Sequence, residues 1–152
     1  MKIAELMTTD VKTCRQTDTL DVAVELMKEF DIAAVPVVDP VGRIVGIVTD
    51  RDACLAVYAH RQPLHWLPCA VAMSEHVVTC RADDDATAAE REMATHKIRH
   101  VPVIDDAEKP IGMVSLDDLA LAMAAGRGLS ASELAIALAA ICEPRRRGST
   151  DG

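Results

Sequence analysis

The sequence has few aromatic residues, no long apolar run and an excess of acidic side chains, and each of these features excludes a class of protein. Aromatic residues make up 2% of the 152 residues, which is too few to stack the bases of a single-stranded nucleic acid. No run of 18 apolar residues occurs, so no segment is expected to span a bilayer as a helix. The net charge of −8 repels DNA and anionic membranes. We expect a cytoplasmic protein that binds neither nucleic acid nor membrane.

Signatures of catalysis and of metal binding are also missing. The sequence contains no Gly-x-Ser-x-Gly, no P-loop and no Gly-x-Gly-x-x-Gly, so we expect neither enzyme activity nor a required cofactor. The five cysteines include no Cys-x-x-Cys pair, which is typical of reduced, mostly buried thiols. His60, His65 and Cys69 lie within one short segment, but their spacing matches no usual zinc pattern. A metal or redox role through these residues is therefore a minor alternative.

The sequence does contain an internal repeat with an offset of 66 residues. The segment Gly46–Asp52, GIVTDRD, and the segment Gly112–Asp118, GMVSLDD, share a glycine, two apolar residues, a hydroxyl and a carboxylate at matching positions. Residues 7–59 align with residues 73–125 without a gap. Repetition at a fixed offset indicates two copies of one structural unit.

Each copy predicts the order strand, helix, strand, strand, helix. The strands are expected at residues 11–14, 34–38 and 43–48 in the first copy, and at 77–80, 101–104 and 111–114 in the second. Apolar residues at helical spacing predict a first helix over 20–30, and the second helix is expected to begin at Thr49 or Asp50. Pro36 and Pro102 lack an N–H, so each is expected at a sheet edge or where another segment approaches the backbone.

The expected fold is α/β (α+β), with two pseudo-symmetric β-α-β-β-α repeats packed sheet to sheet, plus a C-terminal helix. One repeat is too small to be stable alone, so the two are expected to bury each other's sheet faces and to leave clefts between them. Ser130 and Glu133 fit a capping box at the start of the extra helix. The expected divisions are 1–59 for repeat 1, 60–72 for a linker, 73–125 for repeat 2, 126–143 for the C-terminal helix and 144–152 for a disordered tail. The arginines at 145–147 are expected to be solvated rather than bound to nucleic acid.

The repeated phrase has two interpretations. A hydroxyl followed three residues later by a carboxylate is an ordinary helix start, with the hydroxyl as the cap. The same turn also offers the free N–H groups of a helix N-terminus to a phosphate, and a carboxylate that can accept two hydrogen bonds from a ribose diol. The duplication favours the second interpretation, in which the two copies are two ribose-phosphate half-sites.

These motifs resemble a pair of cystathionine-β-synthase-type (CBS) domains, the arrangement called a Bateman module. The resemblance covers about residues 1–125. The matching segments are Met7 to Thr13, Ile32 to Asp39 and Gly46 to Asp52, and in the second copy Met73 to Thr79, Ile98 to Asp105 and Gly112 to Asp118. The resemblance implies a stand-alone regulatory sensor that binds an adenosine ligand (AMP, ADP, ATP or S-adenosylmethionine) in the clefts between the repeats.

The resemblance also implies roles for individual residues. Asp52 and Asp118 would hold ribose hydroxyls, and Thr49 and Ser115 would meet the phosphate. The backbone that faces the adenine would come from Val11, Thr13, Ala34, Val35, Pro36, Val77, Thr79, Val101 and Pro102.

The two copies differ around these positions. Arg99 and His100 replace two alanines of the first copy, at a position from which basic residues of this family often reach phosphates. Asp117 replaces Arg51, and its negative charge disfavours a second phosphate nearby. The resemblance therefore implies two unequal nucleotide sites.

The outer helices suggest how such a protein would assemble. Apolar side chains at residues 50–59 and 116–125 predict a disk-like homodimer, and a downstream protein partner would respond to its geometry. The helix at 130–142 is expected to cover a sheet or to extend the dimer interface. A ligand-free structural dimerisation protein is the main alternative to the sensor.

Overall fold

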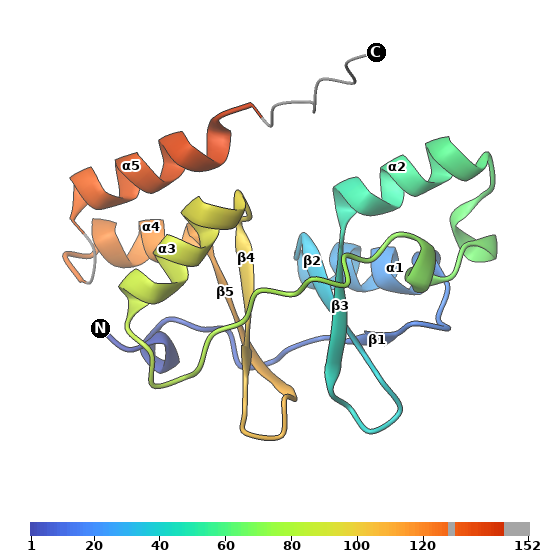
Figure 1. The fold of residues 1–152 in the computed structure, drawn as a ribbon, viewed down its shortest axis with the longest axis horizontal. Helices are drawn as coiled ribbons and strands as arrows, with labels where there is room; N and C mark the ends of the chain where they lie inside the picture. The colour runs from blue at the N-terminus through green and yellow to red at the C-terminus, as the bar shows by residue number, and fades with distance from the viewer. Residues whose placement is uncertain (128–129, 145–152) are drawn as a thin grey trace, which may run out of the picture.

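The computed structural model describes residues 1–127 and 130–144, and its elements repeat once along the chain (Figure 1). The first repeat consists of β1 (Cys14–Arg15), α1 (Leu20–Phe30), β2 (Ala34–Val38), β3 (Ile44–Thr49) and α2 (Asp50–His60). The second consists of α3 (Ala86–His96), β4 (His100–Ile104), β5 (Pro110–Ser115) and α4 (Leu116–Ala124), and α5 (Ala131–Cys142) follows it. The expected tail at 145–152, with its arginine run, lies outside the described residues.

The strands form two small sheets, in the orders β1-β2-β3 and β4-β5. Figure 1 shows the strands of both repeats in the middle, with α1 and α2 beyond one sheet and α3 and α4 beyond the other. The two repeats therefore meet through their sheets, as the fold class predicted. The first strand of each repeat is shorter than expected, because β1 covers two residues and residues 77–80 contribute only a bridge between Cys80 and Val103.

The shortening has a physical cause, because the segment before each first strand crosses to the other repeat. The backbone of Ser74 exchanges two hydrogen bonds with Ile47 in β3, at N···O distances of 2.9 and 3.1 Å. Thr8 and Met113 in β5 make the equivalent pair at 2.9 and 3.0 Å. A segment that pairs with one repeat cannot also extend the sheet of the other.

The same crossing explains the two strand prolines. Pro36 lies opposite Ile47 in the central strand β2, so of its two expected positions it takes the one where other segments approach rather than a sheet edge. Because the carbonyl of Ile47 already accepts a hydrogen bond from Ser74, Pro36 needs no N–H to complete the ladder. Pro102 has the same relation to Met113 in the second repeat. Its own carbonyl accepts from the N–H of Cys80 at 3.0 Å, as expected where another segment approaches.

Each repeat has its own hydrophobic core between its sheet and its helices. One core gathers around Leu20, Val35 and Val48, and the other around Met93, Val101 and Leu119. Each core also receives residues from the segment that precedes the other repeat. Ile3, Leu6 and Met7 pack into or against the second core, and Leu67, Cys69 and Met73 pack into the first. The sheet-to-sheet contact therefore joins two cores rather than forming a single one.

The glycines that open the repeated phrases lie where the repeats approach most closely. A Cβ on Gly46 would lie 2.6 Å from the Sδ of Met73, and a Cβ on Gly112 would lie at the equivalent place against Met7. The methionine of each crossing segment therefore packs over the glycine of the other repeat. The glycine of each phrase is therefore needed because a larger side chain would collide with this methionine.

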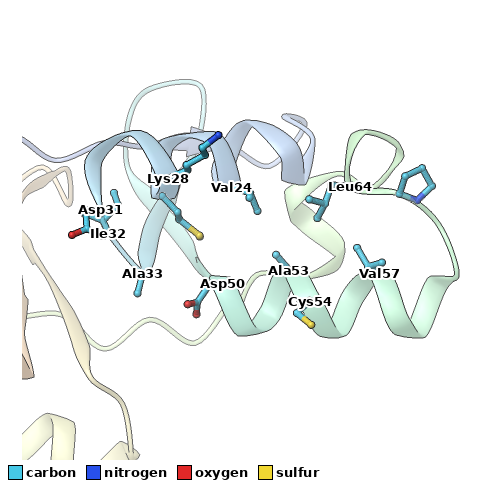
Figure 2. Close-up of a pocket in the computed structure, with 12 residues that line it drawn as sticks. Val24, Lys28, Asp31, Ile32, Ala33, Asp50, Ala53, Cys54, Val57 and Leu64 are labelled. Atoms are coloured by element: carbon cyan, nitrogen blue, oxygen red, sulfur yellow. The ribbon is translucent and has the colours of Figure 1, made fainter.

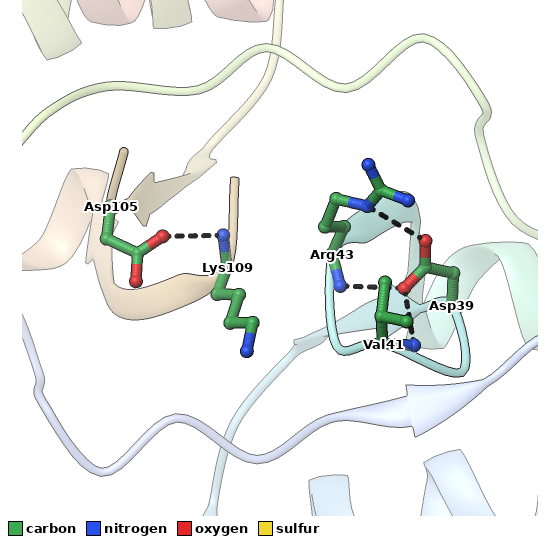
Figure 3. A network of polar contacts seen from close by, with 5 residues as sticks. All are labelled: Asp39, Val41, Arg43, Asp105 and Lys109. Carbon is green, nitrogen blue, oxygen red and sulfur yellow. Dashed lines mark hydrogen bonds and ion pairs between the residues drawn. The ribbon is translucent and has the colours of Figure 1, made fainter. Parts of the chain in front are cut away.

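An aspartate shapes each hairpin turn (Figure 3). One carboxylate oxygen of Asp39 accepts hydrogen bonds from the N–H groups of Val41 and Arg43 at 3.0 and 2.9 Å, and Asp105 makes equivalent bonds in the second repeat. Burial acts to raise the pKa of the Asp39 carboxyl, but the bonds from Arg43 and Val41 outweigh it and hold that pKa below its usual value. The turns are thus fixed by local polar contacts.

Helix α5 begins at the expected capping box of Ser130 and Glu133. It packs against α3 and α4 rather than against a sheet (Figure 1). Leu134, Ala137 and Ile141 form its inner face, and Ala137 is fully buried. The first repeat has an apolar pocket of about 760 Å³ between α1 and α2 at the corresponding place (Figure 2). The two repeats therefore differ most in how their helical faces are covered.

Candidate functional site

The repeated phrase forms a helix start in both copies. The N–H and the hydroxyl of Thr49 both donate to Asp52 Oδ2, at 2.9 and 2.7 Å, and the N–H of Asp52 donates to Thr49 Oγ1 at 3.2 Å. Ser115 and Asp118 repeat this capping box at 2.7, 2.6 and 3.1 Å. The capping interpretation is therefore confirmed for both turns.

The cap leaves one carboxylate oxygen of each aspartate for a ligand. Both side-chain bonds described for Asp52 and for Asp118 end on Oδ2. An ionised carboxylate has about four lone-pair positions, so Oδ1 can still accept hydrogen bonds from a diol. Capping and ribose binding are therefore compatible in the same turn.

The N–H groups at the start of α2 are not free for a phosphate, contrary to our expectation. The N–H of Asp50 donates to the carbonyl of Ala33 at 3.2 Å, and that of Arg51 donates to Asp50 Oδ1 at 2.7 Å. The next N–H, on Asp52, is bonded to Thr49. A phosphate at this turn therefore depends on side-chain donors.

A cavity of about 690 Å³ lies beside the Thr49–Asp52 turn, between the two repeats. This volume is within the range of small-molecule sites. Its lining includes six residues that the sequence analysis named, which are Thr49, Asp52, Val77, Arg99, His100 and Pro102. The turn of one repeat and the Pro strand of the other therefore meet at one site.

The other predicted residues lie outside this lining. Ser115 and Asp118 form the equivalent turn of the second repeat. Val35 and Val101 are fully buried core residues, so only their backbone could face a ligand. The remaining predicted residues that do not line the cavity are Val11, Thr13, Ala34, Pro36 and Thr79.

Several lining residues were missed by the sequence analysis. They include Ser74, His76, His96, Lys97, Ile141 and Glu143. His76 directly precedes Val77 and His96 lies at the end of α3, so reading the segments next to the matched motifs could have found both. Ile141 and Glu143 follow from the position of α5, which the repeat does not encode.

The charged groups of the cavity have different surroundings. The Lys97 ammonium lies 3.1 Å from Glu143 Oε2. In the described part of the chain, the guanidinium groups of Arg51 and Arg99 make no ion pair within 4.0 Å. These two side chains can therefore bind an anion without breaking a contact.

His100 is a half-buried histidine of this cavity. Burial lowers the pKa of its imidazole, and the nearby carboxylates of Asp117, Asp50 and Asp118 oppose this effect only in part. Arg99 lowers the same pKa further. His100 is therefore a neutral hydrogen-bonding group near pH 7, rather than a cation.

The alternative metal or redox site is not assembled as a ligand cluster. No three of the His, Cys, Asp and Glu side chains within residues 1–127 and 130–144 lie together as a possible metal site. His60 and His65 are exposed, whereas Cys69 is fully buried with its Sγ 3.7 Å from that of Cys14. The hydrogen bond to Cys69 and burial both raise the pKa of the Cys14 thiol.

Within residues 1–127 and 130–144, no helix is both long and apolar enough to cross a membrane.

The architecture defines a class of protein, a pair of small α+β repeats with a cavity between them, and comparison identifies the family. The CBS domain model matches residues 3–59 and 70–125. The Bacillus subtilis (strain 168) protein YlbB is 38% identical over 121 residues, which cover 79% of this chain and 80% of YlbB. The CBS domain-containing protein YhcV of the same organism is 34% identical over 119 residues, covering 78% and 83%. The chain therefore belongs to the CBS domain family.

A solved structure agrees with this assignment. The CBS domain pair of protein MJ0100, crystallised in complex with 5′-methylthioadenosine and S-adenosyl-L-methionine, has a TM-score of 0.76 and 21% identity to this chain. The match covers 84% of this chain and 98% of that one. The chain thus has the fold of a CBS domain pair.

Proposed function

We propose that this protein is a regulatory module that binds an adenosine ligand in the cavity between its two CBS repeats. The observation that carries the proposal is the Thr49–Asp52 turn, in which Asp52 accepts its cap bonds on Oδ2 and lines a cavity that Val77 and Pro102 also line. The complex of MJ0100 with two adenosine compounds supports the same ligand class.

In this proposal, each group of the ligand meets a different part of the cavity. Asp52 Oδ1 accepts hydrogen bonds from the ribose hydroxyls, and Val77 and Pro102 contact the adenine. Arg51 and Arg99 meet the phosphate, together with the Thr49 hydroxyl if it turns away from Asp52. Ser115 and Asp118 form the second half-site, with the backbone at Val11, Thr13, Ala34, Thr79 and Val101 near the adenines.

The module acts without catalysis, since no catalytic signature is present in the sequence. Ligand binding changes the geometry of the pair only if the ligand has different affinities for two states. Exposed apolar side chains on α2 and α4, at Leu55, Tyr58 and Leu121, favour a homodimer. We place this dimer in the cytoplasm, where a downstream protein partner would respond to its geometry.

Calorimetric titration with AMP, ADP, ATP and S-adenosylmethionine tests the proposal. We expect at least one of them to bind, and Asp52→Ala to weaken its binding by at least about tenfold, because hydrogen bonds to a charged group are worth about 1.5–3 kcal/mol. Asp52→Ala also removes a helix cap, which costs about 1 kcal/mol of stability. Glu133→Ala is the matched control, since it removes the cap of α5 outside the cavity lining.

The contrary result favours the second candidate function. Folded protein that binds none of these ligands at millimolar concentration contradicts the sensor. The exposed apolar residues on α2 and α4 would then point to a ligand-free dimerisation protein. If Asp52→Ala and Glu133→Ala lose the same affinity, the ligand does not bind at the Asp52 turn.

A further inference from the structure

The two histidines at the edge of the cavity, His76 and His96, lie together and have no role in the proposal so far. Their ring centroids are 5.9 Å apart, and both side chains are exposed. His96 Nε2 also lies 3.3 Å from Glu92 Oε2. Val78, two residues after His76, lines the same cavity.

The internal repeat supplies a direct comparison for this pair. At an offset of 66 residues, His76 corresponds to Asp10 and His96 corresponds to Phe30. In the first repeat, the Lys12 ammonium lies 2.8 and 2.9 Å from the two carboxylate oxygens of Asp10. The same ammonium lies 4.1 Å from the centroid of the Phe30 ring. A carboxylate and an aromatic face thus hold a cation that the chain itself provides.

The second repeat inverts this arrangement. Val78 takes the place of Lys12 and carries no charge, while two imidazoles take the places of the carboxylate and the phenyl ring. Two imidazoles present N–H donors, so they suit an anion where the first repeat suits a cation. In the first repeat, Lys12 occupies the position beside Asp10 and Phe30. In the second repeat, the equivalent position beside His76 and His96 holds no lysine and suits an anionic ligand.

A phosphorylated ligand in this cavity needs side-chain donors, because the backbone N–H groups at the start of α2 are already hydrogen-bonded. The first N–H groups of α2 are bonded to Ala33, Asp50 and Thr49, and the Thr49 hydroxyl donates to Asp52. The side-chain donors that line the cavity include the guanidinium groups of Arg51 and Arg99 and the imidazoles of His76 and His96. These four groups are enough for more than one phosphate.

We propose that His76 and His96 form a phosphate subsite, and that the ligand of this cavity is an adenosine nucleotide with more than one phosphate. The inference rests on the proposed function and narrows the class of adenosine ligand to ADP, ATP and similar nucleotides. With the ribose on Asp52, Arg51 and Arg99 bind the first phosphate and the imidazole pair binds a later one. S-adenosylmethionine carries a sulfonium and an ammonium against one carboxylate, so its net positive charge meets the guanidinium groups of Arg51 and Arg99 and it binds less well. The other turn, with Asp117 and Asp118, lacks this subsite, so one polyphosphate nucleotide binds per chain.

Calorimetry with adenosine, AMP, ADP and ATP on the wild type and on the double variant His76→Gln, His96→Gln tests the proposal. In the wild type, we expect ATP or ADP to bind at least tenfold more tightly than AMP, at one site per chain. In the double variant, we expect ATP to bind no more tightly than AMP, while the affinity for AMP stays within twofold of the wild type. His60→Gln, His65→Gln is the matched control, because both histidines are exposed and lie outside the cavity lining.

The outcomes separate the two proposals. If AMP and ATP bind equally well to the wild type, or if the double variant keeps the preference for ATP, the phosphate subsite is wrong while the adenosine site stands. Two polyphosphate nucleotides per chain contradict the single subsite, and tighter binding of S-adenosylmethionine than of ATP contradicts the charge argument. If no adenosine ligand binds, both proposals are wrong. Because both histidines are exposed, thermal unfolding of the double variant is expected to match that of the wild type.

Discussion

At the scale of single residues, the capping aspartates combine two tasks that the sequence presented as alternatives. Asp52 and Asp118 close the first turn of their helices with Oδ2 and leave Oδ1 free of described side-chain contacts. A carboxylate can do both because its two oxygens accept hydrogen bonds independently. The helix start therefore fixes the orientation of the group that we propose to bind ribose, at no cost in side-chain freedom when the ligand arrives.

His100 yields a prediction on pH. Its pKa in the folded chain lies below the ordinary value of 6.5, so the unfolded chain takes up a proton first as the pH falls. The free energy of unfolding therefore decreases as the pH drops below about 6.5, where the unfolded chain binds more protons. We expect the unliganded wild type to lose more stability between pH 7.5 and pH 5.5 than His100→Gln does, as measured by urea unfolding.

The opposite sign of this difference would mean that the carboxylates around His100 prevail over burial. Asp50, Asp117 and Asp118 all face this imidazole and raise its pKa. If they dominated, His100 would be a cation at neutral pH, and its variant would gain relative stability as the pH rises. The comparison therefore decides whether His100 acts as a neutral hydrogen-bonding group or as a phosphate-binding cation.

At the scale of elements, the crossing segments are what unite the two repeats. Met73 packs over Gly46 in β3 and Met7 packs over Gly112 in β5, and the backbone pairs of Ser74 and Thr8 lie next to these contacts. The same crossings shorten the first strand of each repeat. The packing of one repeat on the other thus depends on positions where no side chain fits.

Gly46→Ala is expected to destabilise the protein by about 1–3 kcal/mol, the usual range for overpacking a well-filled contact. The new Cβ would lie 2.6 Å from Met73 Sδ, so the methionine must move. Urea unfolding of Gly46→Ala, Met73→Ala and the double variant measures the coupling. We expect the double variant to cost less than the sum of the two single variants, whereas strictly additive costs would show that Met73 does not cause the destabilisation.

The sequence predicted these elements well where the signal was local. The starts of α2 and α4 at Thr49 and Ser115 follow from cap chemistry, and the start of α5 at Ser130 follows in the same way. The short first strands were not predictable, because Ser74 and Thr8 pair with the other repeat and no local pattern encodes that pairing. The contribution of α5 to the cavity was missed for the same reason.

At the scale of the whole molecule, the pair is symmetric in backbone and asymmetric in chemistry. Both repeats carry the same turn, yet α5 covers only the second, and the pocket between α1 and α2 stays open on the first. His76, Val78 and His96 stand where the first repeat has Asp10, Lys12 and Phe30, and we propose that this changes a cation position that Lys12 occupies into a place for an anion. The expectation of two unequal nucleotide sites stays a prediction, to which the proposal adds this difference.

A crystal structure of the protein with bound ATP tests the central claim most directly. We predict one nucleotide in the cavity between the repeats, with a ribose hydroxyl within hydrogen-bond distance of Asp52 Oδ1. The phosphates should extend past Arg51 and Arg99 toward His76 and His96. A structure in which ATP lies elsewhere, or in which the cavity stays empty at saturating ATP, would contradict the account.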